Sequence, residues 1–217
     1  MQSLSLLQKI FVFAIPTLLA ITIHEAAHGY VARYFGDRTA EMLGRLTLNP
    51  IKHIDPVGTI LVPVSLLVLG FPFLFGWAKP VPVATRNLRN PHRDMAIVAA
   101  AGPASNLAMA AGWTLILAFV MAFAGGSSLF LPLQLMAEWG VFFNILLAIF
   151  NLFPLPPLDG GRVLSGFLSP RASVSFDRIE PYGLFIIVGL LATGVLWKIV
   201  GPVINLVAGF FFGLVGA

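Results

Sequence analysis

The sequence contains no cysteine among its 217 residues. This absence excludes disulfide bonds, thiolate metal ligands and a cysteine nucleophile. Charged residues are scarce as well: they make up 10% of the chain, against about 25% in an average soluble domain, whereas 58% of the chain is hydrophobic. Too few charges remain to cover a water-facing surface, and intrinsic disorder requires the opposite composition. The composition therefore predicts a membrane protein, with residues 1–217 forming one integral domain in the lipid bilayer.

Long apolar runs divide the chain, and each is about long enough to cross a hydrocarbon core of roughly 30 Å. They cover residues 4–35, 57–75, 94–124, 131–153, 181–197 and 202–214. The pattern predicts an all-α polytopic membrane protein with about five to six transmembrane helices. Residues 57–75 contain Pro63, Gly70 and Pro72, which suit a re-entrant element. Residues 42–48 and 78–83 are expected to be extended. We therefore expect a membrane-associated β-strand or re-entrant element between the first run and the third.

The distribution of basic residues predicts the topology. If residues 57–75 span the membrane, the 13 Lys and Arg divide eight against five between the two faces. If they enter and return, eleven share one face and only Lys9 and Lys198 lie opposite. The positive-inside rule favours the second arrangement, with the N-terminus outside and the basic loops in the cytoplasm. Because these residues are scattered between apolar runs, the pI of 9.9 does not indicate nucleic-acid binding.

The motif His24-Glu25-Ala26-Ala27-His28 lies inside the first apolar run. On a helix, positions i and i+4 are only about 40° apart around the axis, so both imidazoles can reach one metal ion. Glu25 lies beside them and can act as a general base. Ionisable side chains are costly inside a membrane unless they are paired or used. The motif therefore predicts an intramembrane metal site.

A catalytic zinc site usually has three protein ligands, so one more residue is needed. Asp159 is a candidate because it follows a proline-rich break between two apolar runs, although Pro-Pro-x-Asp-Gly is also typical of a simple turn. His53 and His92 are the alternatives. Both lie in polar stretches between runs, where surface or gating roles are common.

Three motifs together resemble the site-2 protease family of intramembrane zinc metalloproteases. They are the HEAAH motif, Gly102-Pro103-Ala104-Ser105-Asn106 and the N-x-x-P-x-P-P-L-D-G stretch that begins at Asn151. The resemblance covers about residues 10–170, in the family's order, and is to the minimal form without PDZ or CBS domains. It implies one Zn²⁺ per chain, bound by His24, His28 and Asp159.

The same resemblance implies further roles. Glu25 would be the general base, and Asn106 and Asn151 would line the substrate cleft, where either is a candidate donor to the oxyanion. The expected reaction is hydrolysis of a peptide bond within or near the transmembrane segment of a single-span membrane protein, as in regulated intramembrane proteolysis. The active site would lie nearer the cytoplasmic face. An exposed strand edge at residues 42–48 or 78–83 could hold the unwound substrate backbone.

Two other functions are compatible with parts of the pattern. A catalytically inactive relative could bind membrane peptides as a scaffold, but the intact Glu25 argues against this. A metal transporter would need ligands arranged along a path and often contains paired repeats, and no repeat is visible here. Zinc-dependent cleavage of a single-span peptide in detergent separates the three functions.

Overall fold

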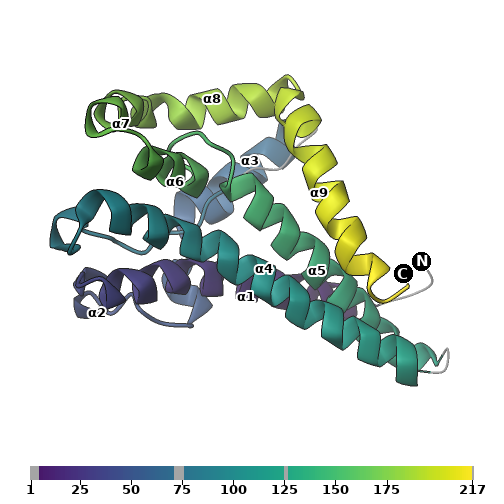
Figure 1. Ribbon diagram of the computed structural model, residues 1–217. Coiled ribbons are helices and arrows are strands. Elements are labelled where there is room, and N and C mark those ends of the chain that lie inside the picture. The colour runs from purple at the N-terminus through teal and green to yellow at the C-terminus, as the bar shows by residue number, and fades with distance from the viewer. Residues whose placement is uncertain (1–4, 71–75, 125–126, 217) are drawn as a thin grey trace.

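The structure is a computed structural model that describes residues 5–70, 76–124 and 127–216. Over these ranges the chain forms helices, turns and extended segments, and none of the described residues is in a β-strand. Three long helices pack against one another in the centre, namely α1 (Leu6–Tyr34), α4 (Pro91–Phe123) and α5 (Leu131–Asn151). Helix α9 (Val195–Gly213) packs against α5 (Figure 1). The prediction of an all-α protein is confirmed.

Shorter elements surround this bundle. Helix α6 (Asp159–Phe167) packs against α4, and α7 (Pro170–Asp177) follows it, as Figure 1 shows. The shorter elements are α2 (Thr39–Met42), η1 (Pro50–His53), η2 (Pro56–Leu61), α3 (Val62–Val68), η3 (Thr85–Asn87), η4 (Ser128–Phe130), α6 (Asp159–Phe167), α7 (Pro170–Asp177) and α8 (Glu180–Ala192).

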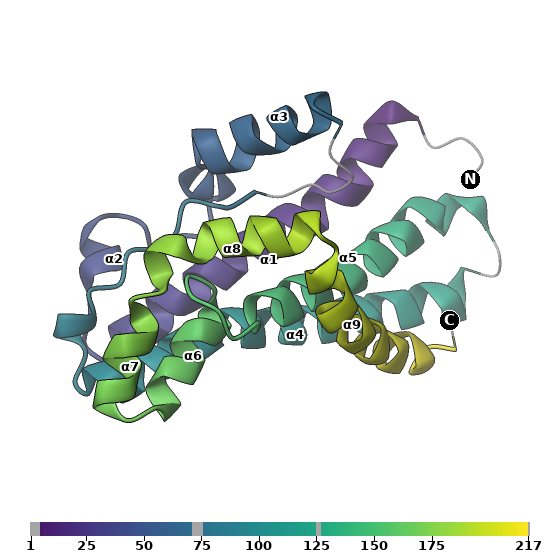
Figure 2. The same cartoon turned by 90° about the horizontal axis from the view of Figure 1, so that it is seen from above.

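Four of the described helices, α1, α4, α5 and α9, are long and apolar enough to cross a membrane. The expected number of five to six is not confirmed, because α8 has only 13 residues. It ends before Gly194, whose φ of 72° lies in the left-handed region that glycine adopts without strain. Helix α9 then begins, and it continues through Pro202, where the sequence suggested a break. In Figures 1 and 2, α9 ends at the end of the bundle where α5 begins.

The region between α1 and α4 contains no strand among its described residues. Residues 42–48 form the end of α2 followed by turns and a bend, so the extended segment expected there is absent. Residues 78–83 belong to no helix and no strand, so the strand expected there is not confirmed. The run at 57–75 is helical in η2 and α3, and residues 71–75 lie outside the described part of the chain.

After α3, the chain returns to the residues that precede and begin η2. The backbone N–H of Trp77 donates to the carbonyl of Gly58 over 3.1 Å, and that of Lys79 donates to His53 over 2.9 Å. The segment therefore begins and ends at the same level of the bundle.

The helices bury apolar side chains between them, and they also expose apolar side chains on the outside of the bundle. One buried cluster joins α4, α5, α8 and α9, and it consists of Ala110, Val141, Ile145, Ile187, Leu191, Leu196, Val200, Ile204 and Ala208. Large apolar side chains also point outward, among them Leu115 at 72% exposed and Phe185 at 76% exposed. A soluble monomer seldom exposes so much contiguous apolar surface, whereas hydrocarbon accommodates it.

Candidate active site

His24 and His28 lie one turn apart on α1 and face the same point. Their Nε2 atoms are 3.1 Å apart, and both side chains are buried. Asp159, the first residue of α6, brings its Oδ2 within 3.1 Å of His24 Nε2 and 3.4 Å of His28 Nε2. Helix α6 packs on α4, which in turn packs on α1, and this arrangement carries Asp159 across 131 residues of sequence to the two histidines. The structure thus brings together the three predicted ligands.

Hydrogen bonds on the far side of each imidazole fix its orientation. The Nδ1 of His24 contacts Oδ1 of Asn106 at 2.6 Å, and the Nδ1 of His28 contacts the carbonyl of Val98 at 2.7 Å. Since a carbonyl oxygen can only accept, each Nδ1 carries the proton and donates. Both Nε2 atoms then keep a lone pair that faces Asp159. Metal-binding histidines have this arrangement in general.

The space between the three side chains fits a metal ion. Their ligand atoms all lie within 4.8 Å of one another, and Oδ2 of Asp159 is buried without a hydrogen bond. Gly102 of α4 forms one wall. A Cβ at this position would lie within 2.6 Å of His24 Nε2 and closer still to His28 Nε2, so only glycine leaves the space open. Two imidazoles and a carboxylate with room for one more ligand match a catalytic zinc site.

Asn106 is fully buried, and its whole amide group is engaged. Its Oδ1 accepts from His24, while its Nδ2 donates to Oδ1 of Asn144 at 2.9 Å and to the carbonyl of Ala20 at 3.2 Å. Asn144 in turn donates to the carbonyl of Gly140. This geometry favours a role in orienting His24, because an oxyanion could be bound only if the amide gave up one of these bonds.

Sequence reasoning did not identify Asn144. It is completely buried in the middle of α5, inside an apolar run, and it holds the Asn106 amide. A polar residue at such a position is by itself a sign of function, because an unpaired amide is costly in hydrocarbon. That signal was available in the sequence, although the partner of Asn144 was not.

We expect Asn106→Ala to lower the affinity for zinc about 10- to 100-fold, because the His24 ring loses the acceptor that fixes it. Titration of the purified protein against a chromogenic zinc chelator measures the change. Asn205→Ala is a matched control, since Asn205 lies on the exposed side of α9. If both variants bind zinc as the unmodified protein does, Asn106 does not orient His24.

The other predicted residues lie around the same space. Asn151, at the end of α5, is half-buried, lines the cleft beside Asp159 and donates to the carbonyl of Leu147 at 2.9 Å. His53 is buried, and its Nε2 contacts the carbonyl of Thr47 at 2.9 Å. His92 is exposed and contacts the carbonyl of Leu168. Neither histidine belongs to the group of possible metal ligands.

Glu25 follows His24 on α1 and faces residues 78–83. Its Oε2 accepts a hydrogen bond of 2.8 Å from the backbone N–H of Val81. The side chain is half-buried and lines the same cleft as the histidines and Asp159, but it is not one of the possible metal ligands. Glu25 is therefore placed to exchange a proton in the cleft without binding the metal.

The cleft itself has a volume of about 980 Å³. Its walls come from α1, α5, α6 and α8, from residues 50–63 and from residues 76–83. Most side chains of α5 and α8 that line it are apolar, for example Phe143, Phe150 and Ile187, and Asn151 and Glu180 are the polar ones. Such a cleft accommodates an apolar peptide backbone with its side chains.

Comparison with known proteins assigns the family. The model of peptidase family M50 matches residues 120–194. The Bacillus subtilis protein named "Putative zinc metalloprotease YwhC" is 40% identical over 195 residues, which are 88% of this chain and 84% of that protein. Two proteins named "Putative zinc metalloprotease Rip2" are also similar. The Mycolicibacterium smegmatis protein is 31% identical over 81% of this chain and 64% of its own length, and the Mycobacterium tuberculosis protein is 30% identical over 91% and 69%.

No solved structure matches the chain. The similarity to YwhC nevertheless extends far beyond the HEAAH motif and covers most of both proteins. The four apolar helices agree with it, as does the cluster of His24, His28 and Asp159. This chain therefore belongs to peptidase family M50, the site-2 protease family, and is a zinc metalloprotease of the membrane.

Proposed function

We propose that this protein is an intramembrane endopeptidase that hydrolyses a peptide bond within or near the transmembrane segment of a single-span membrane protein. The observation that carries the proposal is the position of the cluster: His24, His28 and Asp159 face a largely apolar cleft between membrane helices, with Glu25 beside them. In the described part of the chain, this is the one group of metal-ligating residues, whereas a transporter needs several along a path. Residues 1–217 form one domain that binds one Zn²⁺ and no nucleic acid.

The roles of the residues follow from their hydrogen bonds. His24 and His28, through Nε2, and Asp159, through its carboxylate, would hold the zinc ion. Bound zinc supplies an acidified water and polarises the substrate carbonyl. Glu25 accepts a proton from the attacking water and later gives it to the leaving amine. Asn151 is the better candidate donor to the oxyanion, because its amide has fewer bonds than that of Asn106.

The substrate must unwind before its backbone can be cleaved, because a membrane helix satisfies its own hydrogen bonds. Residues 78–83 are in neither a helix nor a strand, and most of them line the cleft. Among the described residues, the N–H of Val83 and the carbonyl of Val81 have no hydrogen-bond partner. These groups can pair with an unwound substrate strand by β-addition.

A cleavage assay tests the proposed function. The purified protein, in detergent with equimolar zinc, is incubated with a single-span membrane protein, and the products are identified by mass spectrometry. We expect cleavage within or near the transmembrane segment, loss of cleavage with a zinc chelator and its return with zinc. Binding of the substrate without cleavage by the zinc-loaded protein would instead identify a scaffold.

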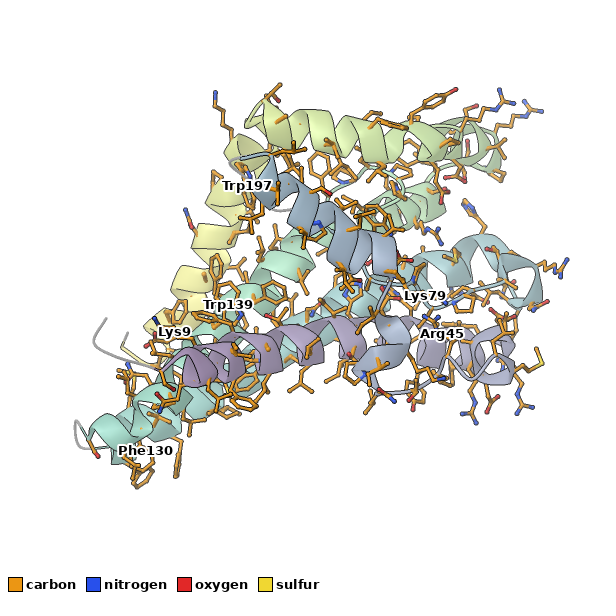
Figure 3. All side chains as sticks on the ribbon, turned by 180° about the vertical axis from the view of Figure 1, so that it is seen from behind. Lys9, Arg45, Lys79, Phe130, Trp139 and Trp197 are labelled. Carbon is orange, nitrogen blue, oxygen red and sulfur yellow. The ribbon has the colours of Figure 1, made fainter. Side chains whose placement is uncertain are left out.

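We further propose a topology in which residues 57–75 enter the bilayer and return to the cytoplasmic face, with the N-terminus outside. Three observations support it. Residues 77 and 79 pair with residues 58 and 53, and the apolar helix Pro56–Val68 has 13 residues, which span about 20 Å rather than the roughly 30 Å required. Arg45 and Lys79 lie together, away from Lys9, as the positive-inside rule demands (Figure 3).

Single cysteines test this topology without background, because the chain has no native cysteine. Leu43→Cys and Thr85→Cys flank residues 57–75 on exposed positions, and Ser127→Cys lies between α4 and α5. In intact cells a membrane-impermeant thiol reagent should modify the Ser127 variant and leave the other two unmodified until the cells are opened. Reaction of Thr85→Cys with protection of Leu43→Cys would show that the segment crosses the membrane.

A further inference from the structure

Residues 76–84, which we call the strap, cross the cleft directly in front of Glu25. Most of the hydrogen bonds that hold the strap lie near its two ends. At the first end, the N–H of Lys79 donates to the carbonyl of His53 at 2.9 Å, and Arg45 donates to the carbonyl of Lys79 at 3.0 Å. At the other end, the N–H of Ala84 donates to Asp37 at 2.7 Å. Between these anchors, the one described polar contact with α1 is the bond from Val81 to Glu25.

Asp37 is a strong anchor for the second end. Only 1% of its surface is exposed, and besides Ala84 its carboxylate accepts from the backbone N–H of Thr39 and from Nδ2 of Asn87, both at 3.0 Å. Burial alone would raise the pKa of Asp37, but the hydrogen bonds from Thr39, Asn87 and Ala84 outweigh it and hold this pKa below its usual value. Asp37 is therefore an anion at neutral pH, and it fixes where the strap ends.

Gly29 allows the strap to approach α1. It lies one helical turn after Glu25 and so faces the same direction. A Cβ at Gly29 would lie 3.0 Å from Cγ1 of Val81 and 2.9 Å from Cδ1 of Leu46, which is closer than such contacts normally are. The Val81 side chain is itself buried against this surface, with 6% exposed. The position of the Val81 N–H is thus determined by packing as well as by the two anchors.

We propose that the backbone N–H of Val81 positions the general base, an inference that rests on the proposed function. The donor engages Oε2 of Glu25 and leaves Oε1 as the oxygen that takes the proton. A glutamate side chain has several rotamers, and a fixed donor selects one of them. Positioning of this kind contributes to turnover, because small displacements of a catalytic group can slow a reaction about 100-fold. Val81 acts through Glu25 and does not itself contact the reacting atoms.

The most direct test replaces the Val81 amide by an ester, through incorporation of the α-hydroxy analogue of valine into the full-length protein. This change removes only the N–H. We expect kcat for a single-span substrate to fall about 10- to 100-fold, with KM and zinc content unchanged. The same amide-to-ester replacement at Ala172, an exposed residue in the first turn of α7 that does not line the cleft, is the control and should leave kcat unchanged. Val81→Pro removes the same donor genetically and should show the same separation of kcat from KM.

A double-mutant comparison shows whether the effect passes through Glu25. Glu25→Asp shortens the side chain by one methylene and withdraws the carboxylate from Val81, so the ester should lower the residual kcat of this variant by less than twofold. Full additivity would overturn the proposal, as would an unchanged kcat in the Val81 ester. A rise in kcat would also overturn it and would show that the hydrogen bond from Val81 holds Glu25 in an inactive position. If the unmodified zinc-loaded protein cleaves nothing, it is the proposed function that fails.

Discussion

Glu25→Gln is expected to abolish cleavage while the protein keeps its zinc. Glutamine has almost the same shape as glutamate and can still accept the hydrogen bond from Val81, but its amide cannot take up a proton at the pH of the assay. General-base catalysis typically contributes about 100- to 10,000-fold, so the turnover of a single-span substrate should fall by at least this much. Zinc content by atomic absorption and cleavage by product formation are measured on the same sample.

Glu138→Gln is the matched control for this variant. Glu138 is also a carboxylate in a membrane helix, but it accepts a hydrogen bond from Gln134 within α5 and does not line the cleft. We expect it to keep both zinc and activity. If Glu25→Gln loses zinc together with activity, Glu25 is a metal ligand and the assignment of the base is wrong.

Asp159→Ala should produce the second large effect, the loss of bound zinc. Among the described residues, its carboxylate is the acidic group that lies within ligand distance of the Nε2 atoms of His24 and His28, and without it two imidazoles remain. Losing an outer partner of a ligand costs about 10- to 100-fold in metal affinity, and losing the ligand itself should cost more. Dialysis against a graded series of zinc buffers, followed by metal analysis, measures the change.

His53→Ala and His92→Ala are the controls, because these two histidines were the alternatives for the third ligand. Their side chains contact the carbonyls of Thr47 and Leu168 instead of the metal group. Both variants should therefore retain zinc. Loss of zinc in His53→Ala with retention in Asp159→Ala would reverse the assignment of the third ligand.

The helix geometry of the HEAAH motif explains why part of the site could be predicted from the sequence. His24 and His28 are neighbours on one helix face, so their convergence follows from the local pattern alone. Asp159 is different, because its position depends on how α6 packs on α4. Composition and spacing alone are equally compatible with Asp159 as a metal ligand and as part of a simple turn. Only the resemblance to site-2 proteases favoured it as a ligand.

The contacts that join distant segments could not be predicted. Nothing in the sequence pairs Asn144 with Asn106, or Val81 with Glu25, because each pair depends on tertiary packing. The expected number of membrane helices is not confirmed for a related reason. The apolar runs place a break between residues 197 and 202, but helix α9 continues through this region and accommodates Pro202, whereas the chain turns at Gly194. Neighbouring helices can compensate for a proline in a membrane helix, so a local breaker does not determine where a helix ends.

The position of the metal is the most direct test of the assignment. Crystals of the zinc-loaded protein, measured on both sides of the zinc absorption edge, locate the ion by its anomalous signal. We predict one peak per chain, enclosed by His24 Nε2, His28 Nε2 and the carboxylate of Asp159, and facing the cleft that contains Glu25. A peak bound by His53 or His92, or one that Asp159 does not contact, would contradict the proposed active site.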